Sequence, residues 1–255
     1  MMFKAFKILM GLLLGCLVIY LVMMNNGFGD LALNYKAHDQ SRAALTSDRT
    51  ITVDDKQWIS FTPNHLELRT AIVLYPGALC DPKAYAPVMR NIAEHGFLTI
   101  IAPMPSNMSI LAPNKLLAIK DAYPQIKTWA LAGHSIGGGA ALMLLNNNED
   151  AIDGLMMWDS YTFAASPANH LTLPITTLYG TSHHSPQRPE KFEAAKAFMP
   201  KHVNYIAIAG GDHFQFGHFN QDDIKTVNTA TISVQQQQQQ VVEHTVNFLQ
   251  KLQSQ

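Results

Sequence analysis

The sequence predicts an α/β protein with a mostly parallel central sheet flanked by helices. Short apolar, β-branched runs alternate with stretches of helical character from residue 70 to the C-terminus, and Gly96 and Pro124 end two of the helical stretches. Strands that alternate with helices imply right-handed crossovers and parallel pairing. The 255 residues and 47% hydrophobic content suit one mid-sized domain with a substantial core.

The N-terminal segment predicts a transmembrane helix. Lys4 and Lys7 precede an uncharged apolar run from Ile8 to Met24. A helix of that length spans about 25 Å, slightly less than the roughly 30 Å hydrocarbon core. No small-residue cleavage site follows, which favours an uncleaved signal anchor over secretion after signal cleavage, the alternative. The lysines orient the N-terminus toward the cytoplasm, so we expect the rest of the protein outside the cell membrane.

We divide the chain into three parts: the signal anchor at residues 1–28, a polar, turn-rich linker at 29–50 and the α/β domain at 51–255. Charged residues make up only 15% of the sequence, and the formal net charge is −1. Without a basic stripe, the composition argues against a nucleic-acid partner. Cys16 lies in the apolar run, which leaves Cys80 as a predicted free, buried thiol. The sequence sets no oligomeric state.

The predicted elements of the domain follow one another in order. Residues 51–63 favour a pair of short strands, and residues 70–77 favour a strand buried on both faces. Asp81 caps and Pro82 opens the first helix. Residues 235–252, which begin in a glutamine tract, predict a closing helix packed on the sheet, and we expect no chemical role for the tract. The remaining strands are expected within 97–103, 127–133, 153–159, 174–180 and 203–211, and the remaining helices within 114–124, 136–148 and 188–200.

A serine stands between two glycines in the segment Gly133-His134-Ser135-Ile136-Gly137, which matches the pattern G-x-S-x-G. The pattern alone is common, but here a buried strand ends before it and a small-residue helix follows it. That setting predicts a nucleophile elbow, a sharp turn that exposes Ser135. Gly138 and Gly139 are expected to let the helix pack tightly against the sheet.

A nucleophilic serine needs a base within hydrogen-bond reach and a group that orients the base. His213 follows the pair Gly210-Gly211 after the last predicted strand. In a mostly parallel sheet the carboxyl ends of the strands carry the ligand site. Among the 11 histidines we therefore predict His213 as the base, ahead of His218.

From about residue 70 to residue 249 the chain resembles the α/β-hydrolase superfamily, and more narrowly its bacterial dienelactone-hydrolase-like members. The matching segments, in chain order, are YPGALCDPKAYAPVMRNIAEHGF, APMPSN, GHSIGGGAA, PITTLYG and GGDHFQFGHF. Dienelactone hydrolases proper carry cysteine at the elbow, so Ser135 implies a serine esterase instead. The resemblance implies no cofactor and a small-molecule ester as substrate.

In this family a nucleophile, a base and an acid form a catalytic triad. The sequence departs from the family at the position of the acid. The usual position follows the strand at 174–180, and no carboxylate occurs there before Glu190. The family also tolerates an acid one strand earlier, where Asp159 stands. Ser135, Asp159 and His213 keep the order nucleophile, acid, base. We predict Asp159 as the acid; a helix-capping role is the alternative. Asp212, adjacent to the base, is a poor candidate.

Two backbone N–H groups are expected to form the oxyanion hole: Ile136, after the nucleophile, and Ala78, with Leu79 as the alternative. A metal site ranks below serine catalysis, because the neighbouring His183 and His184 diverge and no cysteine or carboxylate accompanies them at ligand spacing. The alternative function is a non-catalytic, membrane-tethered binding protein with a degraded triad. The absent carboxylate at the usual position motivates it.

Overall fold

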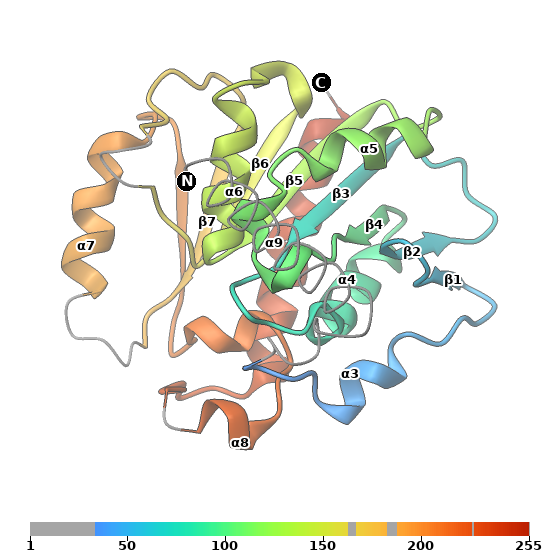
Figure 1. The fold of residues 1–255 in the computed structure, drawn as a ribbon, viewed down its shortest axis with the longest axis horizontal. Coiled ribbons are helices and arrows are strands. Elements are labelled where there is room, and N and C mark those ends of the chain that lie inside the picture. Colours follow the sequence, from blue (N-terminus) through green and yellow to red (C-terminus); the bar gives the residue numbers. More distant parts are fainter. Residues whose placement is uncertain (1–33, 163–166, 183–187, 226, 255) are drawn as a thin grey trace, which may run out of the picture.

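A computed structural model describes residues 34–162, 167–182, 188–225 and 227–254. Its centre is an eight-stranded sheet in the order β1-β2-β4-β3-β5-β6-β7-β8 (Figure 1). β2 pairs antiparallel with both of its neighbours, β1 and β4, and every pair of neighbouring strands from β4 to β8 is parallel. The strands are β1 (Ile51–Asp54), β2 (Ile59–Pro63), β3 (Thr70–Tyr75), β4 (Leu98–Ile101), β5 (Thr128–His134), β6 (Gly154–Trp158), β7 (Ile175–Gly180) and β8 (Asn204–Ile208).

Helices cover both faces of the sheet (Figure 1). The described α-helices are α3 (Asp39–Ala43), α4 (Ala86–Ala93), α5 (Lys115–Ala122), α6 (Ile136–Leu145), α7 (Arg188–Ala195), α8 (Gln221–Ile224) and α9 (Val234–Gln253). Side chains alternate between the two faces along each strand, as the period of two requires. In β3, Ile72 and Leu74 pack with α4 and α9, while Ala71 and Val73 pack with α5 and α6. Continuous apolar runs are therefore needed, because both faces of these strands are buried.

The predicted α/β architecture is confirmed, with each predicted strand present. The glutamine tract forms the start of α9, which a reciprocal pair of hydrogen bonds between Ser233 and Gln236 caps. No helix in the described residues is long and apolar enough to cross a membrane. The predicted anchor at residues 1–28 lies outside those residues.

The described part of the predicted linker is packed against the domain. Tyr35 forms a parallel bridge with Cys80, and Ala37 forms an antiparallel bridge with Phe219. Ser41 is buried, and its hydroxyl donates to the carbonyl oxygen of His218 at 2.8 Å. From Tyr35 onward this segment therefore belongs to the folded unit, which the polar composition of residues 29–50 did not indicate.

Candidate active site

Ser135 stands at a sharp corner between β5 and α6. Its backbone has φ 53° and ψ −122°, a conformation that is strained for a residue with a side chain. A Cβ atom on Gly137 would lie 2.1 Å from the carbonyl oxygen of Tyr75, and one on Gly138 would lie 2.2 Å from the Ser160 hydroxyl. The corner can form only because these positions are glycine. Gly139 differs from the expectation: a Cβ there would meet nothing within 4 Å.

Asp159 and His213 form a close pair across the carboxyl ends of the strands. His213 Nδ1 lies 2.6 Å from Asp159 Oδ2, and the Asp159 side chain is 0% exposed. The other carboxylate oxygen, Oδ1, accepts a hydrogen bond from the Gly180 backbone N–H at 3.3 Å. An ionised carboxylate can only accept, so His213 Nδ1 carries a proton, and in the neutral ring Nε2 is then the basic nitrogen.

The structure places both predicted oxyanion donors in the pocket at Ser135. Ile136 is the first residue of α6, where a backbone N–H has no partner within the helix. The N–H of Leu79, the alternative to Ala78, instead donates to the Asn107 carbonyl oxygen at 2.8 Å. Ala78 is therefore the better placed donor of the two.

Ser135, Asp159 and His213 line one cavity of about 660 Å³. This cavity, called the catalytic pocket below after the roles predicted for its residues, opens where β5 and β6 end and α6 begins. Its remaining described lining residues are Ala78, Ile110, Ile136, Gly139, Leu142, Met143, Ser160, Tyr161, Thr162 and Phe214. Ser160, Tyr161 and Thr162 belong to the segment that follows β6, and residues 163–166 of that segment lie outside the described ones. The structure thus gathers every predicted catalytic residue at one place, and their roles stay predictions.

His134, which sequence reasoning passed over, links the elements of this site. Its Nε2 lies 2.9 Å from the His213 carbonyl oxygen, and its Nδ1 lies 2.8 Å from the Tyr85 hydroxyl. The carbonyl can only accept, so Nε2 donates, Nδ1 accepts and Tyr85 donates to it. Burial raises the pKa of Tyr85 well above its ordinary value, which keeps that proton in place. The Tyr85 oxygen accepts from Gly77 N–H at 3.1 Å, so these hydrogen bonds connect the predicted oxyanion loop, residues 77–79, to the backbone of His213, the predicted base.

Gln237, in the glutamine tract, holds the other side of the His213 loop. It is fully buried, its Oε1 accepts from the Asp212 N–H, and its Nε2 donates to the Asp212 carbonyl oxygen, both at 2.8 Å. The Asp212 carboxylate accepts from Phe214 N–H and from Thr229, and so shapes the loop without touching His213 Nδ1. One residue of the glutamine tract therefore fixes the backbone next to the predicted base, and the expectation that the tract has no chemical role stays a prediction.

We expect Gln237→Leu to lower stability and activity together. The substitution keeps the volume but leaves a buried N–H and a buried carbonyl unpaired, at about 1–3 kcal/mol each. Thermal unfolding should shift down by several degrees, and ester turnover should fall as the His213 loop loosens. Gln239→Leu is the matched control, since Gln239 is exposed in the same tract. Equal melting temperatures for the two variants would contradict the role given to Gln237.

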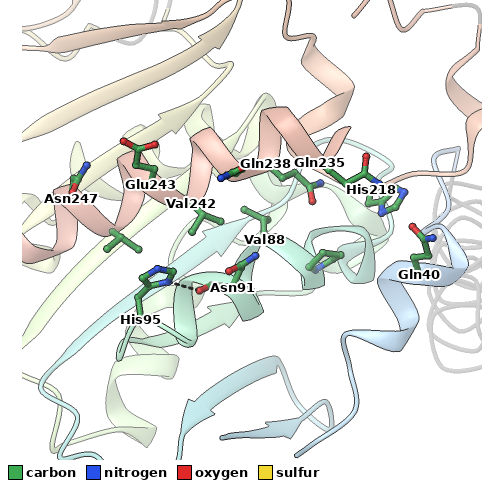
Figure 2. A pocket seen from close by; sticks show the side chains of 13 residues that line it. Gln40, Val88, Asn91, His95, His218, Gln235, Gln238, Val242, Glu243 and Asn247 are labelled. Atoms are coloured by element: carbon green, nitrogen blue, oxygen red, sulfur yellow. Dashed lines mark hydrogen bonds between the residues drawn. The ribbon is translucent and has the colours of Figure 1, made fainter. Parts of the chain in front are cut away.

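His218, the other histidine considered as the base, does not line the pocket at Ser135. Its ring stacks on that of His38, with centroids 4.6 Å apart, and burial together with His38 lowers its pKa. It borders a hollow of about 750 Å³ between α4 and α9 (Figure 2). Amide side chains such as Gln235 and Gln238 line this hollow, and no serine or cysteine among the described residues does. The described residues also hold no group of three potential metal ligands, and His183 and His184 lie outside them.

Cys80 is a free, buried cysteine, as predicted. Burial raises the pKa of its thiol to about 12. At neutral pH the thiol therefore stays protonated, and the thiolate is the reactive form. Its place beside the oxyanion loop is a packing position rather than that of a second nucleophile.

Residues 71–239 match the family model described as "Alpha/beta hydrolase family". The chain belongs to this family, as the sequence motifs indicated, and the prediction of a hydrolase is confirmed. No curated protein matches the sequence.

Solved structures share the fold at low identity. Est1E from Butyrivibrio proteoclasticus is 14% identical, with a TM-score of 0.55 over 81% of this chain and 100% of that one. A ferulic acid esterase from Streptomyces cinnamoneus is 15% identical, with a TM-score of 0.57 over 74% of this chain and 68% of that one. A dienelactone hydrolase from Anabaena variabilis is 13% identical, with a TM-score of 0.52 over 75% and 92%.

Proposed function

We propose that this protein is a serine hydrolase that cleaves carboxylic esters through an acyl-enzyme on Ser135. The observation that carries the proposal is the buried Asp159–His213 pair, at 2.6 Å, in the same pocket as a serine on a strained elbow. A backbone with φ 53° and ψ −122° costs free energy at a residue with a side chain, and strain of this kind is found preferentially at functional sites.

In the proposed reaction, Ser135 Oγ attacks the acyl carbon while His213 Nε2 takes the hydroxyl proton. Asp159 keeps the ring in the correct tautomer and stabilises the imidazolium that forms. The backbone N–H groups of Ala78 and Ile136 hold the oxyanion of the tetrahedral intermediate. His213 then protonates the leaving alcohol. Water, activated by the same histidine, releases the acid and restores the serine.

A fluorophosphonate probe tests this proposal on the wild-type protein, because it phosphonylates only an activated serine. We expect stoichiometric labelling, mapped by mass spectrometry to the peptide that contains Ser135. Turnover of p-nitrophenyl butyrate should continue in the presence of EDTA. Folded protein that resists the probe would count against the proposal, and loss of turnover with EDTA would favour metal chemistry.

The alternative, a binding protein with a degraded triad, is less well supported. It was motivated by the missing carboxylate after β7, and Asp159 after β6 already lies at hydrogen-bond distance from His213. An uncleaved N-terminal anchor, with the domain outside the cell membrane, stays part of the proposal. Retention of the protein in membranes washed with alkaline carbonate would test it.

A further inference from the structure

We propose that the catalytic pocket selects esters whose acyl group is neutral and apolar and longer than acetyl, and that Gly139 keeps the path of the acyl chain open. This inference rests on the proposed serine esterase function. It concerns the substrate class, which neither the fold nor the family defines.

The first support is the face that α6 turns to the pocket. Gly139, Leu142 and Met143 line the cavity and follow Ser135 at four, seven and eight residues, which is the spacing of one helix face. Side chains on a helix tilt toward its N-terminus, so any side chain at position 139 would point toward Ser135. Glycine leaves this space open, since a Cβ at Gly139 would meet nothing within 4 Å.

The second support is the mouth of the pocket. Large hydrophobic side chains that are exposed are few among the described residues: Leu66, Ile110, Leu111 and Met143. Two of them, Ile110 and Met143, line the catalytic pocket, and Leu111 directly follows Ile110. An exposed apolar cluster at the rim of a cavity is typical of a site for an apolar ligand. The volume of about 660 Å³ leaves room well beyond an acetyl group.

The third support is charge. Among the described residues that line the pocket, Asp159 and His213 are the only ionisable groups besides Tyr161, and they are paired with each other. No lysine or arginine of the described chain lines the cavity, so among the described residues a second carboxylate on a substrate would meet no partner cation there. Burial of an unpaired charge is strongly unfavourable. The pocket therefore favours neutral acyl groups over anionic ones.

The test measures kcat/KM for p-nitrophenyl acetate, butyrate, hexanoate and octanoate. We expect about a fourfold rise for each added methylene until the pocket is full, which corresponds to about 0.8 kcal/mol per group. A matched anionic substrate, the mono-p-nitrophenyl ester of adipic acid, has the same acyl length as hexanoate but ends in a carboxylate. We expect its kcat/KM to be lower than that of hexanoate by about tenfold or more.

The variant Gly139→Val tests whether the acyl chain of the substrate passes Gly139. The added side chain should lower the hexanoate-to-acetate ratio of kcat/KM by about tenfold. Gly139→Ala should lower the ratio less, and it should hold or raise the melting temperature, because alanine is a better helix former than glycine. Ala43→Val, on the exposed face of α3, is the control and should keep the wild-type ratio.

The outcomes separate this inference from the function on which it rests. A wild-type protein labelled at Ser135 whose kcat/KM is flat or falls from acetate to hexanoate would overturn the substrate class and leave the proposed function standing. Equal rates for hexanoate and the adipate monoester would do the same. An unchanged ratio in folded Gly139→Val would remove Gly139 from the acyl path. Absence of labelling in wild type would defeat the proposed function itself.

Discussion

Ser135→Ala is expected to abolish fluorophosphonate labelling and to lower ester turnover by about 10⁴- to 10⁶-fold. Oγ is the atom that would attack the substrate, and the neighbouring pocket residue Ser160 is not placed to replace it. The Ser160 hydroxyl donates to the Ser135 carbonyl oxygen at 2.6 Å and thus braces the elbow. The variant should still fold, because it loses only a hydroxyl that faces the pocket. Circular dichroism and the melting temperature check this.

Ser254→Ala is the matched control for that experiment. Ser254 is exposed at the end of α9, where its hydroxyl donates to the Lys251 carbonyl oxygen. This variant should react with the probe and turn over esters at the wild-type rate. Residual turnover in Ser135→Ala above about a hundredth of wild type, with label on another residue, would assign the nucleophile elsewhere.

The order of elements was predictable because its signals are local. The apolar run of β3 and the helical segment from Asp81 to Gly96 each span at most sixteen residues of sequence, where the continuous apolar run, the cap and the terminal glycine act. The elbow was predictable for the same reason. Its glycines flank the serine that they serve, between a strand and a helix.

The contacts that tune the site were not predictable, because they join distant segments. His134 meets the backbone of a residue 79 positions away, and Gln237 meets one 25 positions away. Inside a run of six glutamines, only the position of each residue on α9 decides which is buried. Gln237 is buried against the backbone of Asp212, and Gln239 is exposed to solvent. A sequence pattern cannot assign that orientation without the packing of the helix.

Gly139 is a second position whose surroundings the sequence could not predict. Three successive glycines after the elbow predicted close packing, and for Gly137 and Gly138 the neighbouring atoms require it. The next residue, Gly139, faces the pocket, and a Cβ there would meet nothing within 4 Å. Helical geometry explains the change, since successive residues differ by about 100° around the axis. Which glycine faces the cavity depends on how α6 docks on the sheet.

Asp159→Asn is the sharper test of the triad, because the geometry dictates how an amide would sit there. Gly180 N–H donates to Oδ1 at 3.3 Å, so the asparagine oxygen would face Gly180. The amide nitrogen would then face His213 Nδ1 and donate to it. The ring would be held with its proton on Nε2, which is the tautomer that cannot accept the proton of Ser135.

We therefore expect Asp159→Asn to lower kcat/KM for p-nitrophenyl esters by about 10⁴-fold and to slow probe labelling in parallel. The near-identical size of asparagine and its retained bond to Gly180 should keep the protein folded, which a melting curve checks. Asp121→Asn, an exposed substitution on α5, should leave both rates at the wild-type value. A purely structural aspartate would show the opposite combination, a lower melting temperature with nearly normal turnover. Wild-type rates in folded Asp159→Asn would show that another group orients His213.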